Sequence, residues 1–221
     1  MKHLFTSEMR QQLAASRAIA TVTVQNVEDA KPLADALLAG GINAVEITMR
    51  TQAALEVMKI IADNYSEMLV MAGTVLTPTQ VRQVQDAGAT CAVAPGMNPL
   101  VLQAAIEAQL PFAPGVATPS EIEQALELDC DILKFFPSEP MGGLKYLKSM
   151  QAPYAHLDLQ FIPLGGLTAE NAEDYLREDI ILAVGGSWIA NASAINSGDW
   201  EGITQRAKAV MQQSELEGNT N

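Results

Sequence analysis

The feature that most limits how this chain can fold is an eightfold alternation of short apolar runs with longer amphipathic stretches. Each apolar run has the length of a buried strand, and the stretches between the runs repeat their apolar residues at helical spacing. The runs recur roughly every 20 to 28 residues, which is the spacing of a strand followed by a helix. The expected strands are Ala18–Val24, Ala44–Thr48, Met68–Gly73, Cys91–Pro95, Pro111–Pro114, Asp131–Phe136, Gln160–Leu164 and Ile180–Val184.

Residues that favour the first turn of a helix follow most of these strands and support the same alternation. Proline comes directly after three of the expected cap residues, where a helix tolerates it best, and one segment, Thr118-Pro119-Ser120-Glu121, has the spacing of a capping box. The expected helix caps are Asn26, Thr51, Thr77, Asn98, Thr118 and Thr168.

Eight strand–helix units predict an α/β protein with a closed (β/α)8 TIM barrel, and Thr6–Ser16 is expected to add an extra N-terminal helix. Residues 1–221 should form a single barrel domain, because a 221-residue chain with 48% hydrophobic residues can build one large core and is short for two. A doubly wound open sheet is the alternative. It is less well supported, because no Gly-x-Gly-x-x-Gly follows the first strand.

Charge and composition limit the partners. A net charge of −13 and a pI near 4.4 oppose binding to nucleic acid or to anionic membrane surfaces. The N-terminus lacks the long hydrophobic region of a signal peptide, and no run is long enough to span a membrane, so we expect a cytoplasmic protein. His3, His156 and the two cysteines have no metal-ligand spacing, which predicts no metal site and no cofactor. Residues 215–221 are polar enough to fray.

Lys134 lies within the apolar run Asp131–Phe136, which is an unusual position for a cation. Burial disfavours the charged ammonium form, so a lysine in a buried strand is either paired with an acid or kept as an amine nucleophile. A structural lysine is the more common case in general. The other strand ends favour the nucleophile here, because they place further reactive groups at equivalent positions.

Glu46 is a carboxylate inside another apolar strand, with Arg50 just beyond the end of that strand. Glu46 alone could serve only to balance the charge of Arg50 or Lys134. If it faces Lys134 across a barrel, it can instead move protons while the amine forms an imine with a ketone. The forked donors of Arg50, with a hydroxyl from Thr74, suit a carboxylate, so an α-keto acid is the expected substrate class.

Glycines crowd the ends of the last two expected strands, as the pairs Gly165-Gly166 and Gly185-Gly186. Glycine lets backbone amides approach an oxyanion closely, and Ser187 adds a hydroxyl next to the second pair. Barrels often bind phosphate at this location. We therefore expect a site for a phosphate or for the end of a polyol, although tight turns also need glycine pairs.

Several of these segments together resemble the class I KDPG/KHG aldolases, over nearly the whole chain from Ile19 to Met211. The segment around Lys134 is the most specific, and the ordered set is more specific than any one part. The matching segments are Val45–Thr51, Ala72–Leu76, Pro114–Glu121, Leu133–Pro137 and Val184–Trp188.

The resemblance implies a metal-independent homotrimer that reversibly cleaves 2-keto-3-deoxy-6-phosphogluconate (KDPG) to pyruvate and glyceraldehyde 3-phosphate. Related enzymes cleave 4-hydroxy-2-oxoglutarate (KHG) to pyruvate and glyoxylate, or act on other 2-keto-3-deoxy sugar-acid phosphates. Lys134 would be the Schiff-base nucleophile and Glu46 the general acid/base. The implied substrate-binding residues are Arg50 and Thr74 for the carboxylate, Pro95 and Phe136 as pocket walls, and Gly165, Gly166, Gly186 and Ser187 for the phosphate.

The chain departs from the family pattern at Leu164 and Ala94, where family members often have Thr and Ser. Each change removes a hydroxyl near the mouth, and a lost hydrogen bond typically costs about 0.5 to 1.5 kcal/mol. These departures bear on the choice of aldehyde partner and leave the pyruvate chemistry unchanged. Two other classes stay open: a barrel isomerase or decarboxylase that uses Glu46 without covalent catalysis, and a sugar-acid binding protein without activity.

Overall fold

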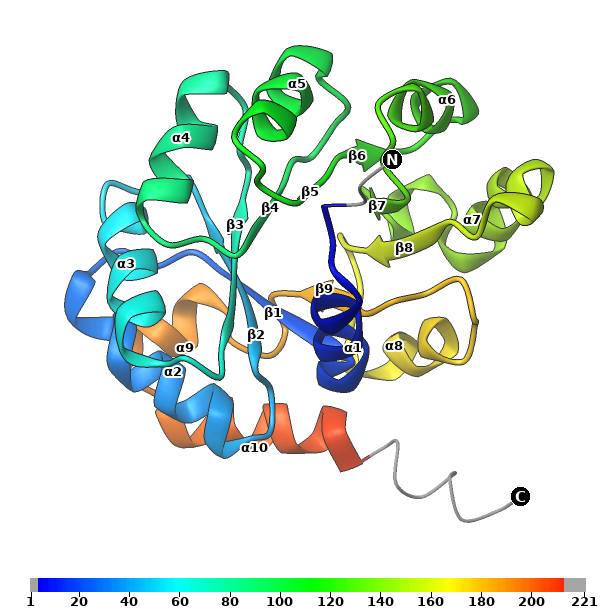
Figure 1. Cartoon of the computed structure of the whole chain (residues 1–221). Helices are drawn as coiled ribbons and strands as arrows, with labels where there is room; N and C mark the ends of the chain where they lie inside the picture. Colours follow the sequence, from blue (N-terminus) through cyan, green and yellow to red (C-terminus); the bar gives the residue numbers. More distant parts are fainter. Residues whose placement is uncertain (1–3, 213–221) are drawn as a thin grey trace.

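A computed structural model describes residues 4–212 (Figure 1), so the expectations for His3 and for residues 215–221 lie outside the described part of the chain. The strands are β1 Ala18–Val22, β2 Ala44–Thr48, β3 Leu69–Gly73, β4 Cys91–Val93, β5 Phe112–Ala113, β6 Gly115–Val116, β7 Ile132–Phe135, β8 Gln160–Pro163 and β9 Val184–Gly186. The α-helices are α1 Ser7–Ser16, α2 Ala30–Ala39, α3 Ala54–Asn64, α4 Pro78–Asp86, α5 Pro99–Glu107, α6 Pro119–Glu127, α7 Gly143–Gln151, α8 Ala169–Leu176, α9 Ala192–Ser197 and α10 Trp200–Gln212. Short 3-10 helices lie at Val27–Asp29, Glu139–Met141 and Ala152–Leu157.

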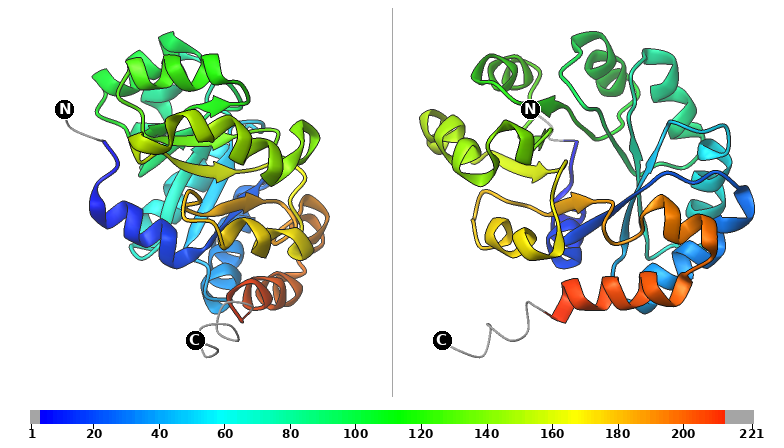
Figure 2. Two further views of the ribbon diagram at one scale, coloured as in Figure 1. Left: turned by 90° about the vertical axis from the view of Figure 1, so that its right-hand side faces the viewer. Right: turned by 180° about the vertical axis from the view of Figure 1, so that it is seen from behind.

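The fold is α/β, with a curled parallel sheet of six strands in the order β5-β4-β3-β2-β1-β9 and a second sheet in the order β6-β7-β8 within residues 4–212. Figure 1 shows the strands around a common centre, with helices on the outside, and Figure 2 shows the same arrangement from the side and from behind. The last strand pairs with the first, and the order never reverses as it does in a doubly wound sheet. The six-stranded sheet therefore curls back toward its own beginning.

Ala44–Thr48 has the expected bounds, five other expected strands are one or two residues shorter in the structure, and the fifth and eighth differ more. The fifth is divided into β5 and β6 at Pro114, because proline has no N–H to donate to the ladder. The eighth lies at Val184–Gly186 and not at Ile180–Val184, and Ile181 forms only an isolated bridge with Phe161. Glycine has low strand propensity, which is why the expected strand ended before Gly185 and Gly186.

Four of the expected caps directly precede a helix, because α4, α5, α6 and α8 begin one residue after Thr77, Asn98, Thr118 and Thr168. The capping box expected at Thr118–Glu121 was wrong, because the Thr118 hydroxyl donates to the Glu121 carboxylate at 2.9 Å and makes no cap hydrogen bond. Asn26 precedes the 3-10 helix ahead of α2 and makes no side-chain cap hydrogen bond. The expectation for Thr51 was wrong. Helix α3 begins at Ala54, and the Thr51 hydroxyl instead donates to the Val24 carbonyl oxygen at 2.7 Å.

The two faces of the curled sheet belong to two different hydrophobic clusters. In β2, Ala44 belongs to the inner cluster, which fills the space enclosed by the strands, whereas Val45 and Ile47 pack in the outer cluster against the helices. Side chains alternate along a strand, so residue 46 must point inward. In β7, Ile132 lies in the inner cluster, and the same alternation turns Lys134 inward.

Helix α1 closes the amino-terminal end of this inner space. Thr6 caps α1, and its hydroxyl accepts the Met9 amide at 3.2 Å. Phe5 and Leu13 are part of the inner cluster, and Arg10 donates to the Asp131 carboxylate at 2.7 and 2.8 Å beside the start of β7. Side chains at the opposite, carboxyl ends of the strands are left to form a site.

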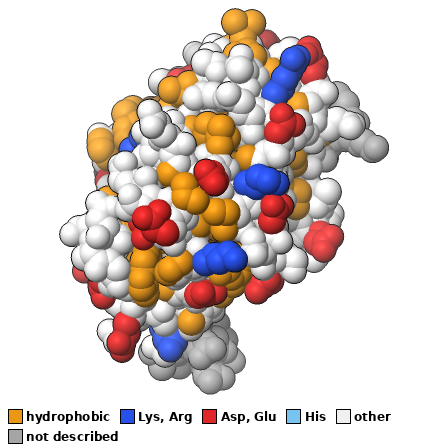
Figure 3. Space-filling model, turned by 90° about the vertical axis from the view of Figure 1, so that its left-hand side faces the viewer, with side chains coloured by type: hydrophobic (Ala, Val, Ile, Leu, Met, Phe, Trp, Pro, Cys, Tyr) orange, Lys and Arg blue, Asp and Glu red, His pale blue; other side chains and the backbone are white. Residues whose placement is uncertain are grey.

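The outer surface carries charges of both signs. Figure 3 shows the side of the molecule where α2, α3 and α4 lie, and basic side chains on this face are scattered among acidic ones. This face therefore lacks the continuous basic patch that nucleic-acid binding requires. No helix within residues 4–212 is long and apolar enough to cross a membrane.

Candidate active site

A cavity of about 490 Å³ opens at the carboxyl ends of the strands. All ten residues proposed from the sequence as catalytic or substrate-binding line it, although they come from elements far apart in the chain. They are Glu46, Arg50, Thr74, Pro95, Lys134, Phe136, Gly165, Gly166, Gly186 and Ser187. The strand ends thus bring the sequence candidates together in one place.

Lys134 and Glu46 form a buried pair at the base of this cavity. The Lys134 Nζ atom lies 3.0 Å from Glu46 Oε1, and the two side chains are only 6% and 2% exposed. Removing two charges from water is costly, and their attraction offsets that cost only when the geometry is good and the remaining polar atoms are satisfied. The Phe136 ring lies 5.4 Å from the same Nζ and covers it on one side. An amine and a carboxylate in this contact can exchange a proton directly.

A hydrogen bond from Thr21 and the space left by Gly73 fix the position of the Glu46 carboxylate. The Thr21 hydroxyl donates to Glu46 Oε2 at 3.3 Å, so each carboxylate oxygen has a partner. Gly73 provides the space, because a Cβ atom there would lie 2.1 Å from Glu46 Oε1. Only glycine at this position leaves room for the carboxylate to face Lys134.

Cys91 lies in the inner cluster close to the buried pair, but its thiol is unreactive. Burial, and secondarily the negative charge of Glu46, raise the pKa of the Cys91 thiol far above its usual range. The thiolate is the nucleophilic form of cysteine. Lys134 is therefore the nucleophile available beside Glu46.

Arg50 and Thr74 follow the ends of β2 and β3 and face the cavity with unused donors. Arg50 is exposed and forms no ion pair with any residue between 4 and 212, and the Thr74 hydroxyl makes no hydrogen bond within the same residues. Thr74 has a φ of +60°, a left-handed conformation that is strained for a residue with a branched Cβ. Such strain is typical of functional sites, and the two groups can grip a carboxylate together.

The Gly165-Gly166 turn forms another part of the wall. Its φ values of +95° and +84° require glycine, and a Cβ on Gly165 would lie 3.1 Å from the Phe136 ring. The neighbouring loop fixes the turn, because the Ser138 amide donates to the Leu164 carbonyl oxygen at 2.7 Å and the Glu139 amide to that of Gly165 at 3.0 Å. This clamp holds the turn in a single position.

Buried side chains support the clamp from behind. The Tyr175 hydroxyl donates to the Glu139 carboxylate, so the Ser138 hydroxyl must donate to Tyr175, at 2.8 Å. Burial, followed by the hydrogen bond to Glu139, raises the pKa of the Tyr175 phenol above its usual range. The phenol therefore stays protonated and acts as a structural donor.

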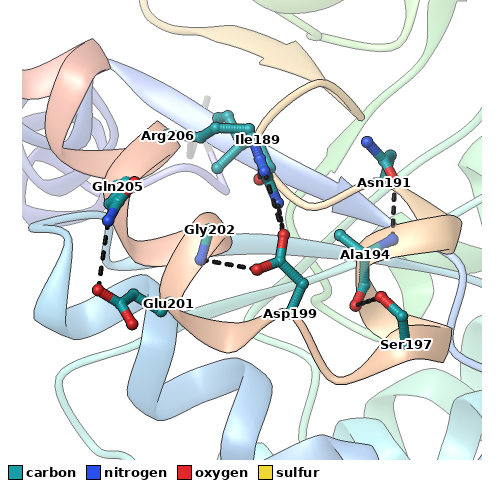
Figure 4. Close-up of polar contacts among 9 residues, drawn as sticks. All are labelled: Ile189, Asn191, Ala194, Ser197, Asp199, Glu201, Gly202, Gln205 and Arg206. Carbon is teal, nitrogen blue, oxygen red and sulfur yellow. Dashed lines mark hydrogen bonds and ion pairs between the residues drawn. The ribbon is translucent and has the colours of Figure 1, made fainter.

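The segment that carries Ser187 is anchored from α10 (Figure 4). Arg206 Nε donates to the Ile189 carbonyl oxygen at 2.9 Å, and the same guanidinium lies 3.4 Å from the Asp199 carboxylate. Asp199 in turn accepts the Gly202 amide at 3.0 Å in the first turn of α10. The wall beside Ser187 is thus tied to a helix outside the cavity.

Sequence analysis missed several lining residues. Thr21 and Thr23 lie on the inward face of the first strand, and their signal was a pair of hydroxyl residues two positions apart in an apolar run. Leu164 also lines the cavity, where it was noted only as a departure from a family pattern. The remaining missed residues are Leu167, Ala190, Asn191 and Ala192.

A curled parallel α/β fold with a buried lysine–glutamate pair at the carboxyl ends of its strands defines a class of α/β enzymes that use an amine beside a carboxylate. The chain belongs to the KDPG and KHG aldolase family, whose model matches residues 9–206.

Known relatives are similar over nearly their full length. The KHG/KDPG aldolase of Escherichia coli is 37% identical over 204 residues, which cover 92% of this chain and 95% of that protein. The 2-dehydro-3-deoxy-phosphogluconate aldolase of Treponema pallidum is 40% identical over 196 residues, covering 89% and 92%. A crystal structure of KDPG aldolase from Legionella pneumophila, with pyruvate captured as a covalent carbinolamine intermediate, is 37% identical and superposes with a TM-score of 0.86, covering 91% of this chain and 97% of that one.

Proposed function

We propose that this protein is a class I aldolase that reversibly cleaves KDPG to pyruvate and glyceraldehyde 3-phosphate. The observation that carries the proposal is the buried amine of Lys134, 3.0 Å from the Glu46 carboxylate. The names of the E. coli and T. pallidum relatives support the reaction. The carbinolamine in the L. pneumophila enzyme supports a covalent route through an amine.

The proposed mechanism uses the pair for both amine chemistry and proton transfer. The Lys134 amine, after passing a proton to Glu46, attacks the C2 ketone to give a carbinolamine. Glu46 returns that proton to the C2 hydroxyl, which leaves as water, so an iminium ion forms and Glu46 is again a carboxylate. Glu46 then takes the proton of the C4 hydroxyl. The C3–C4 bond breaks, its electron pair moves into the iminium to form an enamine, and the aldehyde leaves. Protonation of C3 and addition of water release pyruvate and return the free amine.

The other lining residues would position the two ends of the substrate. Arg50 and Thr74 would hold the pyruvate carboxylate with their unused donors, and Pro95 and Phe136 would form the walls around the pyruvyl group. Amides of the glycine-rich segments would bind the phosphate, because their backbone is free of side chains. These segments supply Gly165, Gly166, Gly186 and Ser187.

Reductive trapping tests this proposal. Incubation with pyruvate and borohydride should add one reduced pyruvyl group to the protein, and peptide mapping should find it on Lys134. Lys134→Arg should abolish both the adduct and turnover, whereas Lys145→Arg, a matched change at an exposed lysine, should alter neither. A Lys134→Arg protein that keeps substantial activity would instead favour the non-covalent isomerase or decarboxylase class.

Cleavage of 4-hydroxy-2-oxoglutarate is the second candidate, because the E. coli relative carries both substrates in its name and Leu164 places an apolar group in the cavity. The ratio of kcat/KM for the two substrates decides between them. A clear preference for the unphosphorylated substrate would reverse the proposed order.

We also propose that the two sheets form one closed (β/α)8 ring with α1 as its additional helix, and that residues 1–221 are a single domain. Isolated bridges between Leu164 and Gly185 and between Phe161 and Ile181 support closure, because they join the segments of β8 and β9. The family resemblance suggests a cytoplasmic homotrimer without a cofactor. Light scattering at several concentrations should give three times the mass of one chain, and a monomer would contradict this assembly.

A further inference from the structure

Thr21 and Thr23 place two hydroxyl groups on the cavity wall. Strand β1 alternates, because Ile19 belongs to the inner cluster whereas Ala20 and Val22 pack in the outer one. Thr21 therefore faces inward, and Thr23, one residue beyond the end of β1 and about 7 Å farther along the chain, lines the same cavity. The chain runs toward the mouth, so Thr23 is the nearer of the two to the entrance.

The hydrogen bonds around Thr23 fix it as an acceptor. The Thr48 hydroxyl donates its only proton to the Val22 carbonyl oxygen at 2.9 Å. The 2.9 Å contact between the Thr23 and Thr48 hydroxyls must then use the Thr23 proton. A hydroxyl oxygen keeps two lone pairs after donating. Those of Thr23 have no hydrogen-bond donor among residues 4–212, and a ligand in the cavity can supply one.

Thr21 has a different task, because its hydroxyl donates to Glu46 Oε2. It orients the carboxylate that would take the C4 proton, so it acts as a positioning residue. Thr23 lies farther toward the mouth, on the side to which the substrate carbons beyond C4 would extend. Leu164, Leu167 and Ala190 supply only apolar side chains elsewhere on the wall, which leaves β1 as a polar side for the middle of a substrate.

We propose that Thr23 is a specificity-determining residue that accepts a hydrogen bond from the C5 hydroxyl of the substrate. This inference rests on the proposed aldolase function and names the feature that its aldehyde partner must carry. Glyceraldehyde 3-phosphate has a hydroxyl at the corresponding carbon and can donate. Glyoxylate has a carboxylate there, which only accepts, so its oxygens would face the Thr23 lone pairs without a proton between them. The fixed acceptor therefore favours polyhydroxylated acid phosphates over 4-hydroxy-2-oxoglutarate.

Condensation of pyruvate with three aldehydes tests this inference. The first is glyceraldehyde 3-phosphate, the second is 3-phosphooxypropanal, which has the same length but lacks the hydroxyl, and the third is glyoxylate. Thr23→Val should lower kcat/KM for the first by about two- to tenfold, with a smaller change for the second. Thr23→Ser should retain most of the preference, and Thr79→Val, at an exposed threonine of α4, should leave it unchanged.

Thr48→Val provides the opposite test, because it removes the acceptor that fixes the Thr23 proton. Thr23 could then donate, and kcat/KM for glyoxylate should rise relative to that for glyceraldehyde 3-phosphate. Wild-type discrimination in Thr23→Val, in a preparation that melts normally and still forms the pyruvate adduct, would overturn the inference and leave the aldolase function standing. A wild-type protein that forms no adduct and no aldol product would overturn the function, and the inference with it.

Discussion

Gly73→Ala should disable the site through one methyl group. A Cβ at residue 73 would lie 2.1, 2.7 and 2.8 Å from Oε1, Cγ and Cδ of Glu46, whereas ordinary contacts are about 3.5 Å or more. The carboxylate must therefore move by about 1 Å and leave its contact with Lys134. A displacement of that size can lower kcat by about 100-fold. Overpacking should also cost about 1 to 3 kcal/mol of stability.

Steady-state cleavage of KDPG, borohydride trapping with pyruvate and a thermal melt together measure these effects. Gly96→Ala is the matched control, because a Cβ there would meet no atom within 4 Å. Neither glycine has a positive φ, so the comparison isolates the steric effect from backbone strain. Equal losses of kcat in Gly73→Ala and Gly96→Ala, or wild-type kcat in Gly73→Ala, would refute the reasoning.

Two further substitutions and one labelling experiment test the surroundings of the site. Arg206→Met removes the anchor of the segment that carries Ser187, so KM for the phosphorylated aldehyde should rise several-fold while the rate of pyruvate trapping changes little. Tyr175→Phe leaves the buried Ser138 hydroxyl and the partly buried Glu139 carboxylate without their partner and should lower the free energy of unfolding by about 1 to 3 kcal/mol in urea titrations. Burial and nearby carboxylates raise the pKa of Cys130 to about 12, and that of Cys91 is also raised, so both thiols stay protonated at pH 8. Intact mass spectrometry should find neither alkylated by iodoacetamide before unfolding, and rapid native labelling of Cys91 would contradict its burial beside Glu46.

The alternation of strands and helices, and the inward direction of the lysine, could be predicted because both follow from the period of the apolar residues. Lys134 and Glu46 stand out as charges in otherwise apolar strands, so their position alone indicated a site. The bounds of β9 could not be predicted in the same way. Gly185 and Gly186 lie in β9, where only glycine fits, because Leu164 and Trp188 occupy the space that larger side chains would need. These contacts are not visible in the local sequence.

The roles of the threonine hydroxyls could not be predicted from the sequence either. Threonine is common in strands for its branched shape, so Thr21 and Thr23 read as ordinary strand formers. Their importance depends on which neighbours take their protons, and that requires coordinates. Thr51 shows the reverse error, because its hydroxyl seemed suited to a helix cap but bonds a neighbouring strand end.

Helix α1 and the inner cluster fill the amino-terminal half of the molecule, and this determines the order in which the two products can leave. Phe5, Leu13 and the apolar layer above them block that end, so reactants exchange with solvent through the carboxyl side. A two-part substrate that enters with its keto acid first must release its outer fragment before the inner one can leave. Inhibition by added products should therefore differ in type, with the keto acid competing for the free enzyme and the aldehyde meeting an enzyme already loaded.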